Sequence, residues 1–387
     1  MKSATRKFSI ATSWDPGLLQ GLAALGVEHA VRFEEVFGSF RQGLVGSARQ
    51  AYRLPAVSIE DIAGHIRDAE DVGIGYVHLL NAPEISGRIA DRHWRARLAK
   101  HLEELHGIGV RSLTIANEDL LRFVLESFRA QFRIKLSLIA GVDTVDRARE
   151  VEDLGVDVIT LSPFSVNRDF ERLGAIRASV ACELELYANI PCLHECPLWG
   201  RHYRYLGLTT LIGRPSEPEP DPYLQYCSRV FLEDPVQLVK SPFIRPEDVE
   251  QYFAIGIDRL KLSDRAEPTA FLLRTAAAYA SGRFSGNLFE LVFRSGSKFR
   301  AALGPGSLMA HEPVPIIIDN DKLTSLDFLE RIRSTRGCAL ESFYLEAAAR
   351  AVTLESAAAG RWTSALRQAS ARSRGIPAST LGRIATP

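Results

Sequence analysis

The chain alternates between short strand-like runs and longer helix-like runs, and this alternation limits the fold more than any other feature. Amphipathic stretches with helical spacing lie between the strand-like runs, among them Ile59–Val72, Asp91–His106, Asp119–Phe132, Val145–Leu154 and Arg168–Val180. Eight runs have the pattern of a β-strand, and we expect strands at Phe8–Thr12, Ala30–Phe37, Tyr76–Asn81, Ser112–Asn117, Lys135–Ala140, Val158–Ser162, Glu183–Asn189 and Arg259–Ser263.

A glycine followed by Ile or Val precedes several of these strands. The pairs begin at Gly73, Gly107, Gly155 and Gly256, and each indicates a helix end followed by entry into a strand. Eight βα units of similar size favour an α/β fold in which a parallel sheet closes into a (β/α)8 TIM-like barrel. A doubly wound sheet is the alternative, but the chain has no Gly-x-Gly-x-x-Gly motif to support it.

The seventh unit is much longer than the others. About seventy residues separate strands seven and eight, which is well beyond an ordinary crossover. We expect a barrel domain at 1–283 that includes this insertion at 190–256, a C-terminal extension at 284–354 and a flexible tail at 355–387. Within the extension, 284–318 reads as coil with short strands, including a strand at Pro313–Ile318, and Ala339–Val352 reads as a helix.

Composition argues against several classes of partner. The 387 residues include 47 basic and 47 acidic side chains, so no net charge attracts nucleic acid or an anionic membrane. No apolar run approaches the roughly 20 residues that span a bilayer, and the first residues lack the apolar segment of a secretory signal. Five cysteines without such a signal favour a cytoplasmic protein whose reduced thiols serve metal binding or catalysis.

Charged residues interrupt two neighbouring strand patterns. In a barrel covered by helices the outward residues of each strand are apolar, so polar residues are expected to point inward. Glu185 of strand seven shares a side with Asn189, and we expect it to pair with Lys261 of strand eight in a polar barrel mouth. These two are catalytic candidates, and Asn189 is a candidate for substrate binding. A purely structural ion pair is the alternative, as is an exposed barrel bottom holding Glu183 and Arg259.

Other polar residues stand at strand ends, where barrel enzymes hold their substrates. Glu35 ends strand two and is a further catalytic candidate, while Asn81 and Asn117 are candidates for substrate binding. Arg49 lies in a Gly-Ser loop that suits a carboxylate or a phosphate, although a plain turn is the simpler interpretation. An asparagine at a strand–helix junction is often only an N-cap, which is the simpler interpretation of Asn117.

Four cysteines accompany the irregular seventh unit. Cys192 and Cys196 follow strand seven, Cys227 comes after a Pro-rich tract at 213–222, and Cys338 lies far downstream. Four thiolates are the usual ligands of an iron–sulfur cluster.

Zinc is a rival to the cluster, because His194 and His202 lie close and zinc accepts mixed Cys and His ligands. The three-cysteine motif of radical S-adenosylmethionine enzymes is excluded, since Trp199 occupies its third position. Four unrelated buried cysteines are the remaining alternative. Cys182 lies within the strand-seven pattern and is expected to be a small buried apolar residue.

Several segments resemble the U32 peptidase family, in the branch that carries a Cys-x3-Cys-Pro motif. The likeness covers about residues 8–350 and rests on Gly46–Arg49, Leu79–Ala82, Ser165–Phe170, Glu185–Pro197, Ser241–Asp248 and Gly256–Leu262. Better understood relatives resemble TIM barrels that hold a four-iron–four-sulfur cluster on four cysteines. Several take part in oxygen-independent hydroxylation of ubiquinone precursors or of RNA bases, with prephenate as a proposed oxygen source.

The resemblance implies a 4Fe-4S cluster on Cys192, Cys196, Cys227 and Cys338. It further implies a redox enzyme acting on a small organic substrate, with His194 and His202 as catalytic candidates and Arg201 as a substrate-binding one. The His-Gly and Ser-Gly-Arg-Cys signatures of the peptidase-named members are absent, which argues against both proteolysis and RNA modification.

Two other functions stay open at this point. A peptidase would need a Ser or Cys nucleophile with an adjacent His and acid, and no motif for one is evident. A non-catalytic subunit would hold a structural cluster and pair with a homologous partner subunit. The Arg-bearing tail from Arg361 is expected to be solvated rather than bound to RNA.

Overall fold

The structure is a computed structural model that describes residues 5–85, 87–211, 213, 219–262, 265–304 and 306–373. Three parts of the predictions lie outside the described residues: Ser263 at the end of strand eight, positions 214–218 of the Pro-rich tract, and the tail beyond 373. The chain divides into two compact units, which are described separately below. Unit 1 comprises Met1–Ala188, Leu206–Ser216 and Ile244–Arg283, and unit 2 comprises Asn189–Tyr205, Glu217–Phe243 and Phe284–Pro387.

Unit 1 contains a closed barrel in which each strand pairs in parallel with the next and the last returns to the first. The closure joins the first and eighth strands through the register pairs Phe8 with Leu260 and Ser9 with Lys261. All eight predicted strands are present, and the TIM-like fold is therefore confirmed. The strands are β1 (Lys7–Ala11), β2 (Arg32–Gly38), β3 (Gly75–Leu80), β4 (Ser112–Ile115), β5 (Arg133–Leu136), β6 (Val158–Thr160), β7 (Glu183–Tyr187) and β8 (Arg259–Leu262).

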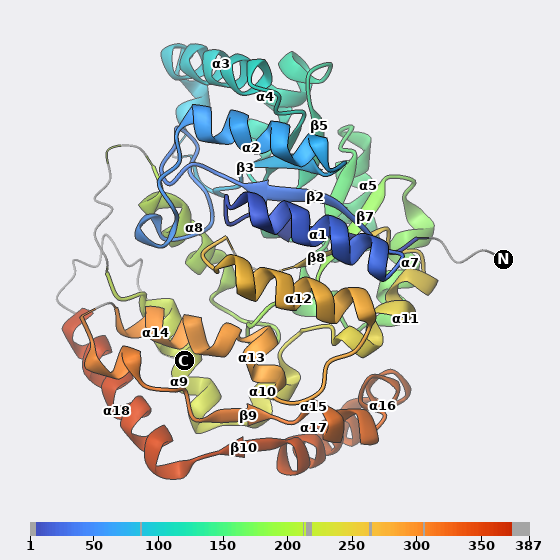
Figure 1. Cartoon of the computed structure of the whole chain (residues 1–387), viewed down its shortest axis with the longest axis vertical. Helices are drawn as coiled ribbons and strands as arrows, with labels where there is room; N and C mark the ends of the chain where they lie inside the picture. Colours follow the sequence, from blue (N-terminus) through green and yellow to red (C-terminus); the bar gives the residue numbers. More distant parts are fainter. Residues whose placement is uncertain are drawn as a thin grey trace. The chain divides into compact units, whose positions relative to one another are not determined.

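Helices connect these strands, and α1, α2 and α12 lie side by side along the barrel (Figure 1). Short 3-10 turns occur in this unit at Ala51–Arg53, Arg88–Ala90, Leu138–Ala140 and Pro246–Asp248. The helices are α1 (Pro16–Glu28), α2 (Ile59–Asp71), α3 (Arg92–Gly107), α4 (Glu118–Phe128), α5 (Val145–Asp153), α6 (Pro163–Val166), α7 (Phe170–Ser179), α11 (Val249–Ala254) and α12 (Thr269–Ser281). No helix among the described residues is both long enough and apolar enough to cross a membrane.

Local sequence explains where these helices begin and end. Helix α2 begins with a capping box in which the Ser58 hydroxyl accepts from the Asp61 amide at 3.1 Å and the Asp61 carboxylate accepts from the Ser58 amide at 2.8 Å. Gly73 follows α2 with a φ of 74°, a left-handed conformation that glycine adopts without strain. After α3 the left-handed residue is Gly109, with a φ of 105°, rather than the predicted Gly107, which is the last residue of the helix.

Unit 2 is mainly helical and has a two-stranded antiparallel sheet of β9 (Ile316–Ile318) and β10 (Val352–Leu354). Helix α9 packs against α14 and α18, and α17 packs against α10, α15 and α16. Two 3-10 turns lie at Arg294–Gly296 and Leu308–His311. The helices are α9 (Pro222–Glu233), α10 (Val236–Lys240), α13 (Leu288–Val292), α14 (Ser297–Leu303), α15 (Asn320–Ser325), α16 (Phe328–Ser334), α17 (Gly337–Ala351) and α18 (Ser356–Ser373), while α8 (Trp199–Thr209) spans the division between the units.

Three predictions for the second half of the chain need correction. Residues 284–318 are not mainly coil, because α13 and α14 bury Phe289, Phe293 and Phe299 in the core of unit 2. The described part of the predicted tail, 355–373, is not a flexible tail, because Trp362 of α18 is fully buried and donates to the Pro313 carbonyl at 3.0 Å. The predicted insertion does not belong to the barrel as a whole, since most of it joins unit 2. These helices are too short or too dependent on remote partners for periodicity to reveal them.

Candidate functional site

A network of buried charges fills the barrel of unit 1, centred on Lys135 of β5. This ammonium, 1% exposed, donates to Glu185 of β7 at 2.7 Å and to Glu35 of β2. The other Glu185 oxygen accepts from the Thr160 hydroxyl at 2.9 Å. Burial tends to raise the pKa of Glu185, but Lys135, Lys261 and Arg259 together hold it well below its usual range. Glu35 and Glu185, two of the catalytic candidates, therefore lie inside the barrel and are joined by Lys135, which no sequence motif indicates.

Lys261 of β8 is the second lysine of this network. Its ammonium lies 3.7 Å from Glu185, which confirms the predicted pairing, and 4.0 Å from the ring centroid of Phe37. Burial, together with the charges of Lys135 and Arg265, lowers the pKa of Lys261 to about 8, although Glu185 acts in the opposite direction. Lys261 is thus a weakly basic amine whose proton can be held or released near neutral pH.

Arg259 of β8 forms the lower part of the network, two positions before Lys261 on the same strand. Its guanidinium donates to Glu34 and, at 2.9 Å, to Glu183. The bottom of the barrel therefore holds the predicted Arg259 and Glu183 together. Arg259 itself is fully buried rather than exposed, because these carboxylates supply the partners that a buried guanidinium requires.

A buried arginine after β8, Arg265, links two loops at the carboxyl ends of the strands. Its guanidinium donates to the Ser39 hydroxyl after β2 and, at 3.2 Å, to the Ser47 hydroxyl. Ser47 belongs to the Gly-Ser loop in which Arg49 was the predicted anion ligand. Arg49 donates to the neighbouring Ala48 carbonyl at 2.8 Å. The loop is thus tied to Arg265 from the segment after β8, a contact that no local sequence motif predicts.

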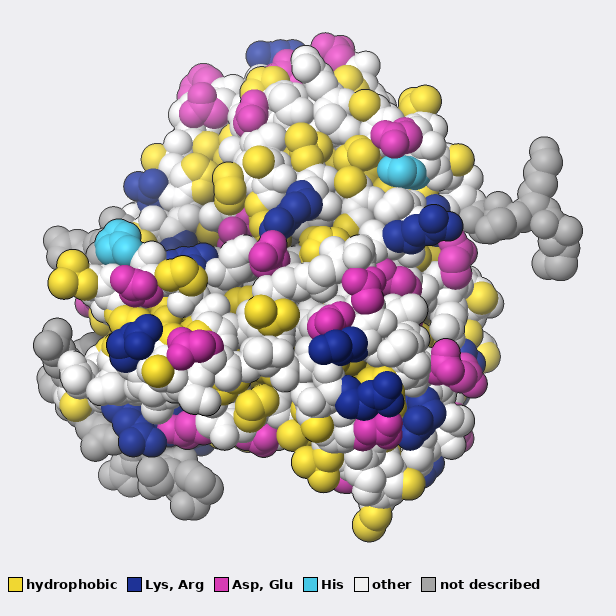
Figure 2. Space-filling model, turned by 60° about the horizontal axis from the view of Figure 1, so that its bottom comes forward, with side chains coloured by type: hydrophobic (Ala, Val, Ile, Leu, Met, Phe, Trp, Pro, Cys, Tyr) yellow, Lys and Arg dark blue, Asp and Glu magenta, His cyan; other side chains and the backbone are white. Residues whose placement is uncertain are grey.

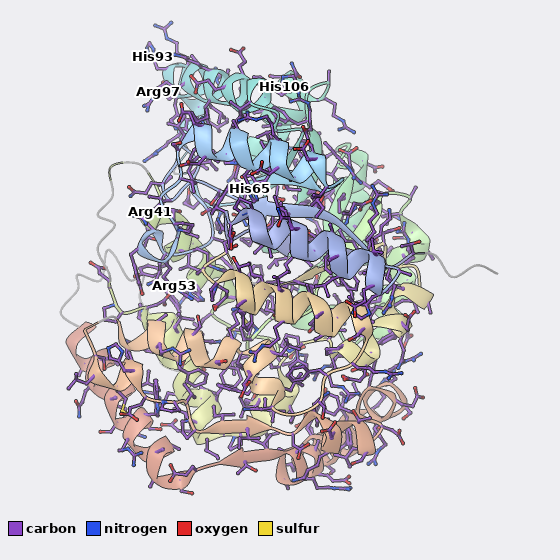
Figure 3. All side chains as sticks on the ribbon, viewed as in Figure 1. Arg41, Arg53, His65, His93, Arg97 and His106 are labelled. Carbon is purple, nitrogen blue, oxygen red and sulfur yellow. The ribbon has the colours of Figure 1, made fainter. Side chains whose placement is uncertain are left out.

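Two histidines of unit 1, His65 and His78, are buried. Burial, His101 and Arg265 lower the pKa of His78 to about 3, and its Nδ1 lies 3.2 Å from the Tyr76 hydroxyl. His65 lies on α2, whereas Arg41 belongs to the loop after β2 (Figure 3). The His65 Nε2 lies 2.7 Å from the Thr12 hydroxyl, and burial lowers the pKa of this imidazole as well.

The three predicted asparagines have different environments. Asn117 is the N-cap of α4, with its oxygen accepting from the Leu120 amide at 3.0 Å and its nitrogen donating to the Pro83 carbonyl at 3.1 Å. Asn81 is partly exposed, and its oxygen accepts from the Ala48 amide at 3.3 Å. Asn189, at the start of unit 2, is fully buried. Asn117 therefore has the capping role that was its simpler interpretation.

Three of the four predicted cluster ligands come together in unit 2. Cys192 and Cys196 are partly exposed and Cys227 of α9 is buried. Cys192 and Cys227 both act electrostatically on Cys196, and burial, followed by Cys192, raises the pKa of the Cys196 thiol to about 11. The Cys227 thiol donates to the Leu224 carbonyl at 3.6 Å.

A buried lysine of α14, Lys298, accompanies these three thiols. Its ammonium hydrogen-bonds with the Cys227 sulfur and donates to the carbonyl of Pro191, the residue before Cys192. Burial tends to lower the pKa of Lys298, but Cys227 and Cys192 outweigh it and raise that pKa. No sequence motif indicates Lys298, because it lies about a hundred positions from the Cys-x3-Cys motif.

The donor set fits an iron–sulfur cluster through three of its four expected ligands. Within the described part of the chain, no three His, Cys, Asp or Glu side chains are close enough to hold a metal ion as they stand. A single zinc ion requires its sulfur ligands at about 2.3 Å from the metal. A cluster is larger, so the cysteines that bind it lie farther apart. Cys338 is exposed at the second position of α17. It is not among the groups that most shift the pKa of the Cys196 or Cys227 thiol.

The remaining candidates surround the Cys-x3-Cys segment. His202 of α8 lies 3.0 Å from Asp221, a fully buried carboxylate that caps α9 by accepting from the Tyr223 amide at 2.9 Å. Burial raises the pKa of Asp221, but His202 and the cap bonds lower it further than burial raises it. His194 and Arg201 are exposed. His202 therefore joins α8 to the helix that carries Cys227. Cys182, which was predicted to be buried, is only partly buried.

The charges on the surface are mixed in sign. Figure 2 shows basic and acidic side chains interspersed over the face that it displays. This distribution agrees with the balanced composition.

Comparison with known proteins gives several similar proteins. No protein-family profile matches the chain. It is 29% identical over 258 residues to an uncharacterized protease of Methanocaldococcus jannaschii, covering 67% of this chain and 75% of that one. Among solved structures, a U32 peptidase is 20% identical with a TM-score of 0.49, covering 69% of this chain and 96% of its own. A thiamine phosphate pyrophosphorylase from Pyrococcus furiosus is 9% identical with a TM-score of 0.37, covering 72% of this chain and 94% of its own. The chain is thus similar to an archaeal protein named as a protease and to a solved U32 peptidase.

Proposed function

We propose that this protein is an iron–sulfur enzyme of the U32 type that carries out redox chemistry, such as oxygen-independent hydroxylation, on a small organic substrate. The observation that supports it most is the gathering of Cys192, Cys196 and Cys227 around the buried ammonium of Lys298. Unrelated core cysteines would not need a buried cation, since neutral thiols pack as small apolar groups. A cluster on thiolates carries negative charge, and a buried cation offsets it.

Cys192, Cys196 and Cys227 would hold the cluster, with Cys338 as the fourth ligand that the family resemblance implies. When bound, such a cluster supplies or accepts single electrons. Pro191 and His202 support this arrangement, because Pro191 accepts from Lys298 and His202 anchors the cap of the Cys227 helix.

The barrel of unit 1 is the proposed binding site for the substrate. Lys261 and Arg265 are two buried cations close enough for Arg265 to lower the pKa of Lys261. We infer that they attract a carboxylate, which prephenate would provide. Lys261 can move a proton at Nζ, whereas Glu185, held ionised by Lys135, stabilises positive charge and orients the two lysines.

Peptidase activity is the second candidate, and the name of the archaeal relative favours it. In unit 1 a hydroxyl and an imidazole do approach each other at Thr12 and His65, 2.7 Å apart. Thr12 is fully buried, however, and His65 is 4% exposed on the inner face of α2. A peptide bond has no access to this pair, so it supports the fold rather than hydrolysis.

Anaerobic purification with iron, sulfide and zinc quantification tests the proposal. We expect about four iron and four sulfide per chain, and loss of both in Cys192→Ala and Cys227→Ala. Cys182→Ala, a change in a cysteine assigned to unit 1, is the matched control and should keep the cluster. Stoichiometric zinc, or full iron in either ligand variant, would contradict the assignment. A loaded cluster without turnover of any tested substrate would instead favour the non-catalytic subunit.

A further inference from the structure

We propose that Lys298 is the buried counter-cation of the cysteine site in unit 2, and that it sets both the stability and the reduction potential of the group bound there. This inference rests on the proposed iron–sulfur function and adds to it a residue that no cysteine motif predicts. Lys298 is a positioning residue, since it acts through the cysteines and their neighbours.

The ammonium of Lys298 lies next to the segment that carries Cys192. The side chain is 6% exposed, so water contributes little to its solvation. Its ammonium hydrogen-bonds with Cys227 and with the Pro191 carbonyl, and it lies 5.0 Å from the ring centroid of Phe231. Cys227, Cys192 and Cys196 are the groups whose charges act on it.

Lys298 also connects two segments that are far apart in sequence. Through Pro191 it fixes the backbone directly before Cys192, and through the Cys227 sulfur it reaches helix α9. A buried ammonium is costly unless negative charge accompanies it. The groups named above are a neutral carbonyl, an aromatic ring and three cysteine sulfurs, of which Cys227 is hydrogen-bonded, and only the sulfurs can become anionic.

This placement has a consequence for redox chemistry. Reduction adds a negative charge to a thiolate-bound cluster, and a nearby buried cation favours the reduced form. Hydrogen bonds to the sulfurs and net local charge are among the factors that tune such potentials. Removing the charge of Lys298 should therefore make the cluster harder to reduce and easier to lose.

Four proteins test the inference after anaerobic reconstitution of the full chain: wild type, Lys298→Met, Lys298→Arg and the control Lys240→Met. Lys240 belongs to the same unit but pairs with Glu341 on the surface. The readouts are a dithionite titration followed by electron paramagnetic resonance, and iron transfer to a chelator.

We expect Lys298→Met to show, at the wild-type midpoint, a ratio of reduced to oxidised cluster at least about tenfold lower, which is 59 mV for a one-electron couple. Its iron affinity should fall by about tenfold or more. Lys298→Arg should stay near wild type because it keeps the charge, and Lys240→Met should be unchanged. If Lys298→Met does not fold, Lys298→Gln supplies the uncharged comparison.

The outcomes separate the two proposals. A wild-type protein that takes up no iron refutes the iron–sulfur function itself. A loaded wild type whose midpoint and iron affinity are matched by Lys298→Met or Lys298→Gln refutes only the role of Lys298. An equal loss in Lys298→Met and Lys298→Arg would show that side-chain shape, not charge, matters at this position, which also contradicts the inference.

Discussion

Replacing Lys135 by Met would remove the cation that two carboxylates share inside the barrel. Glu35 and Glu185 would then be left buried at 6% and 0% exposure. Removing one partner of a buried ion pair costs about 3–5 kcal/mol, chiefly because the other charge stays uncompensated. Arg259 lies 3.9 Å from each carboxylate and Lys261 lies 3.7 Å from Glu185, so other cations soften the loss. We therefore expect a destabilisation of about 3 kcal/mol at neutral pH, at the lower end of that range.

The effect should depend on pH in a defined direction. In the wild type the folded-state pKa of Glu185 lies below its unfolded value. Its ionised form therefore contributes stability that is present above the unfolded pKa and lost as pH falls through the folded pKa. Lys135→Met removes that contribution. The stability difference between the two proteins should thus be largest near neutral pH and shrink as the medium becomes acidic.

Hydrogen exchange of peptides from β5 and β7 measures this stability locally. A local readout is needed because a chain with two compact units need not unfold in one step. Lys100→Met is the control, because Lys100 makes only an exposed ion pair with Glu104 at 3.9 Å and should change stability by less than about 0.5 kcal/mol. A Lys135→Met protein as stable as this control, or one destabilised most in acid, would refute the reasoning.

Three further predictions concern Lys261 in the barrel mouth and the cap of α4. Lys261→Met should weaken the binding of a carboxylate such as prephenate. Binding to the wild type should also weaken as pH rises through about 8, where Lys261 loses its proton. Calorimetry that shows equal affinity in both proteins would contradict this assignment. Because this pKa is lower in the folded protein, the unfolded chain binds more protons above pH 8, so the stability of the wild type should rise relative to Lys261→Met from there to about pH 10.4. Asn117→Ala should lower the free energy of unfolding by about 1 kcal/mol, as expected for a lost N-cap, and leave prephenate affinity unchanged. Thermal unfolding and a binding assay measure the two quantities. A loss of affinity without a loss of stability would make Asn117 a substrate ligand.

Much of the barrel could be predicted because its signals are local. Alternating apolar runs and helix-ending glycines mark each βα unit within about thirty residues, and each strand is present in the structure. Pairing of Glu185 with Lys261 was also predictable, since the two strands are neighbours and their polar faces are known from period-two alternation.

Other features depended on partners that are distant in sequence. Lys135, Arg265 and Lys298 each act through side chains from other elements, and no motif surrounds them. The helices of 284–318 and 361–373 form because a shared core buries Phe299 and Trp362 against each other, with ring centroids 6.4 Å apart. Short helices have too little periodicity to be read alone, and tertiary packing supplies most of their stability.

The sequence by itself thus determined the βα repeat and the closed parallel sheet, because spacing and alternation encode which face of each element is apolar. It also indicated which cysteines are candidate metal ligands. Only the tertiary structure decided which charges share the barrel interior, which cysteines approach one another and which lysine joins them. Those outcomes depend on distances between segments that are up to 225 residues apart. A buried charge is costly unless it is paired, so its partners are fixed by the folded arrangement and not by any local pattern.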